Sequence, residues 1–450
     1  MTKNLKQYLL STFIALALLV AGLWNGFPFL YPDDGTYLHS GFMPEMPLDR
    51  PITYGLFIYV TSLGGWSLWL TIFAQALMTG WVIRMVLKSF FTTQNTDYQF
   101  IVMVGALILS SSISFLSSQL MPDFATPILL LSQLVLLADT PLSKQERRGL
   151  FALFFLTTAM HISHLAYNIL LIAVYFALYA IAKQRFPFLK FKTITTLLGL
   201  TVLSYGTMSV PMAKSGHAFR IGAMAHKGIL DKVLAAKCGE KNWQLCAYRD
   251  SMPHSLEDFL WSANSPLHKI GLVESKKELN DIFWTSLTTP DLLKLHFDAS
   301  LKATAAQLGY FGVGEGNAPF LKGSNAFDAL EKECPNATPQ YLNSRQAHDQ
   351  LVVFFNSFTH FQKKCVILLL IGCFILLLYK PFWSKSNQKM RFFLLFIFLG
   401  LWLNIWLNAT LVYPTNRYGA KMIWLVHLAF FMLLLFFYDK KRTYKERTQP

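Results

Sequence analysis

Apolar residues in this chain form long continuous runs separated by short polar connections. A membrane-spanning helix needs about 20 mostly apolar residues. Runs of this kind occur at 8–27, 66–87, 99–117, 124–138, 149–182, 193–212, 365–379, 391–411 and 420–438. Basic residues flank both ends of 149–182, so this run must leave and return as two short helices that turn near His161–His164. The pattern therefore predicts an all-α integral membrane protein with about ten spans.

The composition agrees with a membrane protein, because 53% of the residues are hydrophobic and only 14% are charged. Soluble domains are about 25% charged. The formal net charge of +15 would suggest nucleic-acid binding in a soluble protein. Threading the spans through a membrane, however, places 19 Lys and Arg residues on one face, together with both chain ends, and only three in the short connections of the opposite face. This asymmetry follows the positive-inside rule, so we expect cytoplasmic termini and no nucleic-acid partner.

The short connections on the opposite, outer face are 28–51, 118–123 and 412–421. Their only basic residues are Arg50, Arg417 and Lys421, and we expect Lys421 simply to bind lipid headgroups. Segment 51–64 is apolar but too short to span, and we interpret it as a helix lying on the outer surface.

The stretch 213–363 differs from the rest, because its charges are mixed and no apolar run in it is long enough to cross a membrane. The span count places it on the outer side as one folded domain of short helices and loops. The sequence thus predicts an N-terminal transmembrane module at 1–212, this extracytoplasmic domain, and a C-terminal transmembrane module with a basic tail at 364–450.

Within the outer domain we expect helices at 227–237, 255–261 and 289–308 and no strands. Cys238 and Cys246 lie close together in the sequence of this domain. In an oxidising compartment such a pair predicts a disulfide.

Ionisable residues from five separate segments are expected at the outer face. Such groups are costly at membrane depth, so their presence invites a functional hypothesis. The residues are Asp33, Asp34, Arg50, Asp123, His161, His164 and Arg417.

Each of these groups also has a purely structural interpretation. The Asp33–Asp34 pair can end a helix in water, and Asp123 can cap the following span. His161 and His164 can be interfacial residues with satisfied hydrogen bonds, and Arg417 can bind headgroup phosphates. Their expected position on one face favours the functional interpretation.

The chemistry open to this set is limited. The chain has no Ser-His-Asp spacing, no P-loop and no dinucleotide-binding glycine motif. What remains is group transfer from a lipid-bound donor. A carboxylate can accept the proton of an attacking hydroxyl, and arginine or histidine can stabilise the charge that gathers on a departing phosphate.

An acidic pair directly after the first helix, in the first outer loop at 28–65, resembles the GT-C membrane glycosyltransferases. In this superfamily, protein mannosyltransferases and aminoarabinose transferases carry an Asp followed by a second acidic residue. Asp33-Asp34-Gly35-Thr36-Tyr37 matches that motif, with Asp33 in the catalytic place. Arg50-Pro51-Ile52-Thr53-Tyr54 resembles the basic-Pro motif that approaches the donor phosphate, and it departs from the motif at Ile52, where a second Pro is common.

The resemblance implies a glycosyltransferase of a bacterial inner membrane that moves a sugar from a polyprenyl-phosphate donor to an extracytoplasmic glycan, lipid or protein. Asp33 would act as general base or position the acceptor. Asp34 and Asp123 would orient the acceptor or hold Mg²⁺ or Mn²⁺. The donor phosphate would be bound by Arg50, favoured for its motif, and by His161, His164 and Arg417. The alternative is a non-enzymatic membrane protein that transports or assembles lipid-linked cell-envelope glycans.

The chain also resembles, over nearly its full length, a family of bacterial multi-span membrane proteins that has no established activity. The motifs that carry this resemblance are Met121-Pro122-Asp123, His161-Ile162-Ser163-His164-Leu165, Cys238 with Cys246, Asp258-Phe259-Leu260-Trp261, and Arg417-Tyr418 through Trp424.

Overall fold

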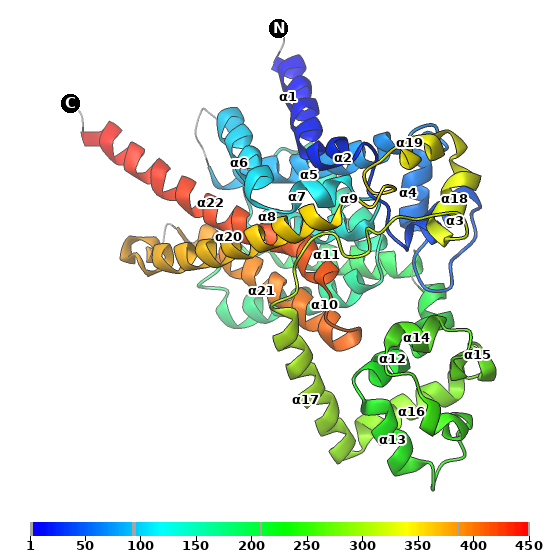
Figure 1. Cartoon of the computed structure of the whole chain (residues 1–450). Helices are drawn as coiled ribbons and strands as arrows, with labels where there is room; N and C mark the ends of the chain where they lie inside the picture. Colours follow the sequence, from blue (N-terminus) through cyan, green and yellow to red (C-terminus); the bar gives the residue numbers. More distant parts are fainter. Residues whose placement is uncertain (1–2, 92–95, 208, 385–386, 449–450) are drawn as a thin grey trace.

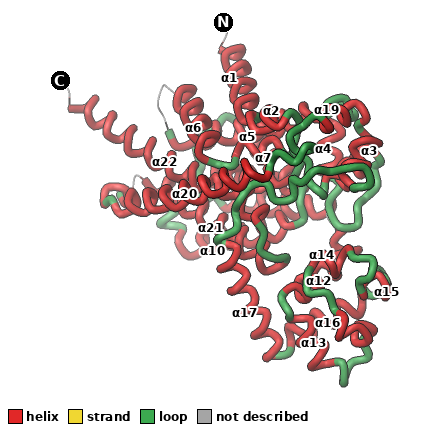
Figure 2. Tube along the Cα trace, viewed as in Figure 1, coloured by secondary structure: helices red, strands yellow, loops and turns green. Residues whose placement is uncertain are grey.

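The computed structural model describes residues 3–91, 96–207, 209–384 and 387–448. Within these residues every regular element is an α-helix or a 3-10 helix (Figure 2), which confirms the predicted all-α class. The only β-type contact in the same residues is an isolated parallel bridge between Phe29 and Gln119.

Most helices pack around one large apolar core and form a bundle (Figure 1). The bundle helices are α1 Lys3–Leu18, α2 Val20–Asn25, α5 Leu68–Phe90, α6 Thr96–Ser110, α7 Ile113–Ser118, α8 Ala125–Leu137, α9 Lys144–Ala159, α10 Ser163–Ala182, α11 Phe191–Ser204, α20 Val352–Leu378, α21 Gln388–Leu411 and α22 Asn416–Thr448.

Five helices in the described residues are long and apolar enough to cross a membrane: α5, α10, α20, α21 and the Asn416–Asp439 part of α22. A sixth span results if the bent pair Phe191–Thr207 and Met212–His226 is counted as one. Several apolar helices are therefore present, while ten spans and their orientation remain predictions.

Polar residues explain why some predicted spans are shorter than expected. The run at 99–117 is broken after Ser110, because the Ser111 hydroxyl donates to the carbonyl of Leu107 and accepts from the amide of Ile113. Serine side chains compete in this way with the helical hydrogen bonds of the backbone. The run at 149–182 breaks between α9 and α10, at the predicted turn.

A smaller unit, which we call the α12–α16 subdomain, has its own apolar core of residues such as Val233, Leu245, Phe259 and Ile282. It lies beside α17, Pro290–Gln307 (Figure 1), and its core also contacts Val412 and Tyr413, which follow α21 of the bundle. A disulfide joins Cys238 to Cys246, as predicted from their spacing. The helices of this subdomain are α12 Ser209–His226, α13 Ile229–Lys237, α14 Leu256–Trp261, α15 Pro266–Ile270 and α16 Lys276–Thr288.

The rest of the stretch 213–363, predicted as a single unit, packs elsewhere. Helices α18 Asn325–Glu333 and α19 Thr338–Leu342 belong to the main core, where α18 packs on α3 Asp34–Phe42. Helix α20 then begins at Val352 and runs without a break across the predicted boundary at 363. The stretch is thus divided between two cores.

Helix α3 packs closely against α4 Thr53–Thr61, which lies within the predicted surface helix 51–64. At their crossing, a Cβ added to Gly41 would lie 2.1 Å from the carbonyl oxygen of Gly55. Only glycine permits this approach. The exposed side of α4 carries Val60, and the connection beyond it carries Trp66.

Candidate functional site

Backbone pairing brings two of the predicted acidic segments side by side. The amide of Phe29 donates to the carbonyl of Ser118, and the amide of Leu120 donates to the carbonyl of Phe29. Asp33 follows the first strand of this bridge, and Asp123 follows the second. The two carboxylates therefore meet, although they come from different connections.

Asp33 stands directly before α3 and contacts two guanidinium groups. Its Oδ1 lies 3.1 Å from Nη1 of Arg50, and its Oδ2 accepts a hydrogen bond of 2.8 Å from Nη1 of Arg417. Burial by itself would raise the pKa of Asp33, but Arg417 and Arg50 outweigh it, so the pKa lies below its usual value. The carboxylate is ionised and can only accept hydrogen bonds.

Asp123 is held by the other side of the same guanidinium. Pro122 begins a short 3-10 helix, Pro122–Phe124, which leads into α8 and positions Asp123 at its first turn. Arg417 Nε donates to Asp123 Oδ2 at 2.8 Å. The Lys421 ammonium forms an ion pair of 3.4 Å with Asp123 Oδ1. We call Asp33, Arg50, Asp123, Arg417 and Lys421 the charge cluster.

Lys421 was not expected in the site, since the sequence indicated only a headgroup-binding residue. In the structure its side chain is 1% exposed. The signal that could have revealed it is its position four residues after Arg417, because residues so spaced lie on the same face of a helix.

Arg50 contacts Asp33 but does not line the cavity that is described below. Its Nε and Nη2 both donate to Asp49 Oδ2, at 3.1 and 2.6 Å, and its guanidinium lies over the ring of Tyr37. Arg417, by contrast, lines the cavity. The geometry thus presents Arg417, rather than the favoured Arg50, to a ligand there.

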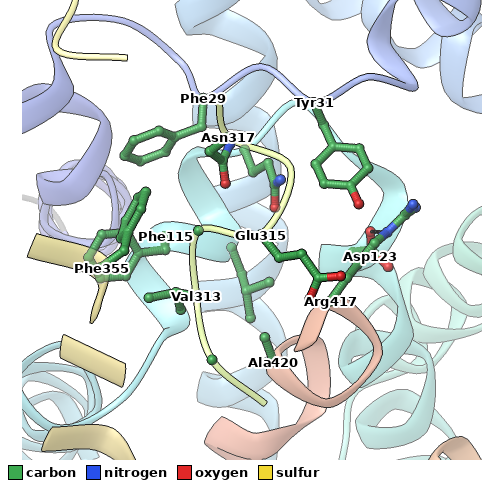
Figure 3. Close-up of a pocket in the computed structure, with 14 residues that line it drawn as sticks. Phe29, Tyr31, Phe115, Asp123, Val313, Glu315, Asn317, Phe355, Arg417 and Ala420 are labelled. Atoms are coloured by element: carbon green, nitrogen blue, oxygen red, sulfur yellow. Dashed lines mark hydrogen bonds and ion pairs between the residues drawn. The ribbon is translucent and has the colours of Figure 1, made fainter. Parts of the chain in front are cut away.

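The cavity beside the charge cluster has two chemically different ends (Figure 3). Asp123, Arg417 and Glu315 form the charged end. The rings of Phe115 and Phe355, joined by Phe29, form the apolar end. The cavity is narrow, with a volume of about 30 Å³.

A glycine-rich segment, residues 312–317, covers this cavity, and we call it the strap. The amide of Gly312 donates to Asn416 Oδ1 at 2.8 Å, and the amide of Asn416 donates to a Glu315 carboxylate oxygen at 2.5 Å. The strap is thereby fixed to the residue that precedes Arg417.

The strap was not predicted from the sequence, although the alternating glycines at 312, 314 and 316 gave a signal. Gly316 has φ +78°, and an added Cβ would lie 2.1 Å from the ring of Tyr31. Asn317 Nδ2 donates to the carbonyl of Leu30 at 2.8 Å. The glycines allow the backbone to lie directly against the cavity wall.

Asp34 plays a different part from Asp33. Its side chain is buried, and its Oδ2 accepts a hydrogen bond of 2.7 Å from the amide of Tyr31. Its Oδ1 has no hydrogen-bond partner in the described part of the chain. Burial raises the pKa of Asp34 well above its usual value, so the neutral carboxyl is favoured. Asp34 secures the start of α3 and does not line the cavity.

The two histidines are not brought into the cavity. His164 bonds to Thr126 Oγ1 at 2.9 Å and to the carbonyl of Thr157 at 2.7 Å, which joins α8, α9 and α10. His161 bonds to Ser163 Oγ at 2.8 Å. These contacts match the structural interpretation of both residues.

The carboxylates do not fit a divalent cation in this arrangement. Asp33 and Asp123 face Arg417 from two sides, and Asp34 is buried apart from both. Among the described residues, no three His, Cys, Asp or Glu side chains come together as a metal site. A guanidinium occupies the position between the acids, and we derive no step through a metal.

Comparison of the chain with protein-family models, curated proteins and solved structures finds no match. The charge cluster and the cavity beside it are therefore the features from which function is inferred.

Proposed function

We propose that this protein is a GT-C-type glycosyltransferase that uses a polyprenyl-phosphate sugar at the outer face of a bacterial inner membrane. The observation that carries the proposal is the two-ended cavity, in which the charged end faces an aromatic end. Such a site suits an amphiphile with an anionic head and an apolar tail.

The apolar end of the cavity continues onto helix α20. The rings of Phe115 and Phe355 lie 5.4 Å apart, and Phe354 and Phe358, on the same helix as Phe355, also pack against Phe115. Helix α20 is apolar enough to span a membrane, and Val353 is 80% exposed. An isoprenoid chain would lie along these side chains, while its phosphate reaches Arg417.

Asp33 and Asp123 would divide the remaining work. Asp33 is 24% exposed and Asp123 only 3%. Asp33 is not part of the cavity wall, so the acceptor would approach it from its exposed side, while Asp123 keeps Arg417 in place. Arg50 fixes the other oxygen of Asp33, which leaves the carboxylate oriented for one proton transfer.

In the proposed reaction, the oxygen of an acceptor hydroxyl forms a bond to C1 of the sugar while the bond from C1 to the donor phosphate oxygen breaks. The hydroxyl proton moves to Asp33. The phosphate oxygen keeps the bonding electrons and leaves as polyprenyl phosphate, whose added negative charge faces Arg417.

The test is transfer of radiolabelled sugar from a polyprenyl-phosphate donor in proteoliposomes that contain the full chain and a bacterial envelope extract as acceptor. Asp33→Asn should lower transfer at least 100-fold, an effect typical of lost general-base catalysis. Asp97→Asn is the matched control, since Asp97 pairs with Arg84 away from the site. Equal activity of the two variants would reject the proposal. Saturable donor binding with no transfer by the wild type would favour the non-enzymatic alternative.

A further inference from the structure

A second, larger cavity lies between the α12–α16 subdomain and the end of helix α21. Its volume is about 530 Å³, and it is open to solvent on one side. Its wall is formed by the end of α12, by α13, by α17 and by the 412–416 turn, which joins α21 to α22. Nothing in the proposed reaction uses this cavity.

Cations dominate the wall of this cavity. Lys227, Lys232 and Lys302 line it, together with a single carboxylate, Asp298. Neither Lys232 nor Lys302 has a carboxylate within 4.0 Å among the residues that the structure describes. The side chains thus leave an excess of positive charge facing the space.

Lys227 and His226 form one edge of the wall. The Lys227 ammonium donates to the carbonyls of Thr410 and Val412, so this charge is fixed at the edge of the cavity. His226 also lines the cavity, and its Nδ1 is buried with no hydrogen-bond partner in the described ranges. This atom is enclosed by protein, so the groups that a ligand in the cavity can reach are the lysine ammonium groups.

The 412–416 turn is a wall shared with the first site. The Gln307 side chain accepts from the amide of Thr415 at 2.9 Å and donates to its carbonyl at 2.7 Å. Pro414 lines the second cavity, and Arg417, three residues later, lines the first. A ligand in the second cavity therefore lies next to the segment that positions the charge cluster.

We propose that this cavity binds a phosphate group of the sugar acceptor, so that the acceptor is an anionic glycan or lipid. The identification of this ligand as the sugar acceptor rests on the proposed glycosyltransferase function. The binding of phosphate in this cavity does not depend on that function. A phosphate dianion carries several acceptor oxygens, which match the ammonium groups. Asp298 lies one turn from Lys302 on α17 and opposes an anion, so the three lysines together supply the net positive charge.

The test is equilibrium binding of radiolabelled inorganic phosphate and pyrophosphate to the full chain in phosphatidylcholine nanodiscs. Replacing both exposed lysines, Lys232→Gln with Lys302→Gln, should weaken binding about tenfold, the effect of losing roughly 1.4 kcal/mol. Lys237→Gln with Lys294→Gln is the matched control, because these lysines lie on the same helices outside the cavity wall. The control should change binding by less than about twofold.

A second arm separates the two sources of phosphate. Nanodiscs that also contain phosphatidic acid present the same group as a lipid headgroup. If phosphatidic acid competes with pyrophosphate, the cavity binds the headgroup of a lipid acceptor. If it does not compete, the cavity binds the phosphate of a soluble glycan. Both outcomes require that the double variant Lys232→Gln with Lys302→Gln binds phosphate more weakly than the wild type.

Two results would overturn the inference directly: no saturable binding of phosphate to the wild type, or equal phosphate affinity of the two double lysine variants. Loss of binding on Arg417→Gln alone would also overturn it, because that loss would place the anion in the first cavity. Asp33→Asn keeps the second cavity intact and should bind phosphate as the wild type does. Phosphate binding without any sugar transfer would therefore reject the proposed function and leave this site standing.

Discussion

Arg417 Nη1 donates a hydrogen bond of 2.8 Å to Asp33 Oδ2, although the two residues lie 384 positions apart in the chain. The same guanidinium donates to Asp123 through Nε. One side chain of α22 thus joins the first connection to the segment before α8. Arginine suits this role because its planar fork offers donors in two directions at once, which a lysine ammonium does with less fixed geometry.

Removing Arg417 should destabilise the protein, because Asp123 would keep only the ion pair with Lys421. Arg417→Ala should lower the free energy of unfolding by about 3 kcal/mol, and Arg417→Lys by less. Arg84→Ala removes a more exposed pair with Asp97 and should cost about 0–1 kcal/mol. Chemical denaturation in detergent measures all three variants. Equal losses for Arg417→Ala and Arg84→Ala would contradict the buried bridge.

Asp33 and Asp34 should contribute to stability with opposite dependence on pH. The pKa of Asp34 is raised by burial, so the folded state favours its neutral form. Its contribution to stability is full below the ordinary value of 3.8 and is lost as the pH rises through the raised value. Asp34→Asn resembles the neutral carboxyl, so it should fold and gain stability relative to the wild type as the pH increases from 4 to 8.

The comparison of wild type and Asp34→Asn is made by thermal unfolding at each pH. Asp33, whose pKa is lowered, shifts stability in the opposite direction, but it is present in both proteins and cancels in the difference. A difference that stayed constant with pH would show that Asp34 is ionised in the fold.

The strap should be sensitive to a single methyl group. Gly316→Ala combines an unfavourable positive φ with a contact against the ring of Tyr31. Gly323 has φ +95° but no atom within 4 Å of an added Cβ, so Gly323→Ala isolates the backbone effect of about 1 kcal/mol. Gly316→Ala should cost roughly 1–3 kcal/mol more. Denaturation midpoints measure both, and a larger loss in Gly323→Ala would contradict this packing.

The disulfide should stabilise the α12–α16 subdomain alone. Closing the short loop between Cys238 and Cys246 limits the unfolded chain, and the double change to Ser should cost roughly 2–3 kcal/mol there. Hydrogen exchange should rise in α13 but stay unchanged in α5, because these helices belong to different cores. Cys365→Ser, a free cysteine on α20, is the control.

Chelation should leave sugar transfer unchanged. Arg417 lies between Asp33 and Asp123 where a cation would otherwise bind. Transfer in the presence of EDTA should equal transfer with added Mg²⁺ or Mn²⁺. A loss on chelation that one of these ions restores would show that the carboxylates exchange their arginine for a metal.

The sequence by itself determined the helical class and the position of several helices. Continuous apolar runs predicted α5 at 66–87 and α21 at 391–411, and basic flanks predicted the break near His161. Within a membrane the backbone must satisfy its own hydrogen bonds, so a long apolar run leaves little choice but a helix. Asp33, Asp123 and Arg417 could be named because each follows or begins such a run.

The tertiary structure alone decided which of the named residues meet. A backbone bridge between Phe29 and Gln119 brings Asp33 and Asp123 to the guanidinium of Arg417. Lys421, on α22, pairs with Asp123, and His164 instead joins three helices. The packing of α18 on α3, which divides the stretch 213–363 between two cores, depends on Gly35, where a Cβ would lie 2.5 Å from Asn325. Such contacts join residues far apart in the chain, and their register depends on side-chain packing that local sequence patterns do not encode.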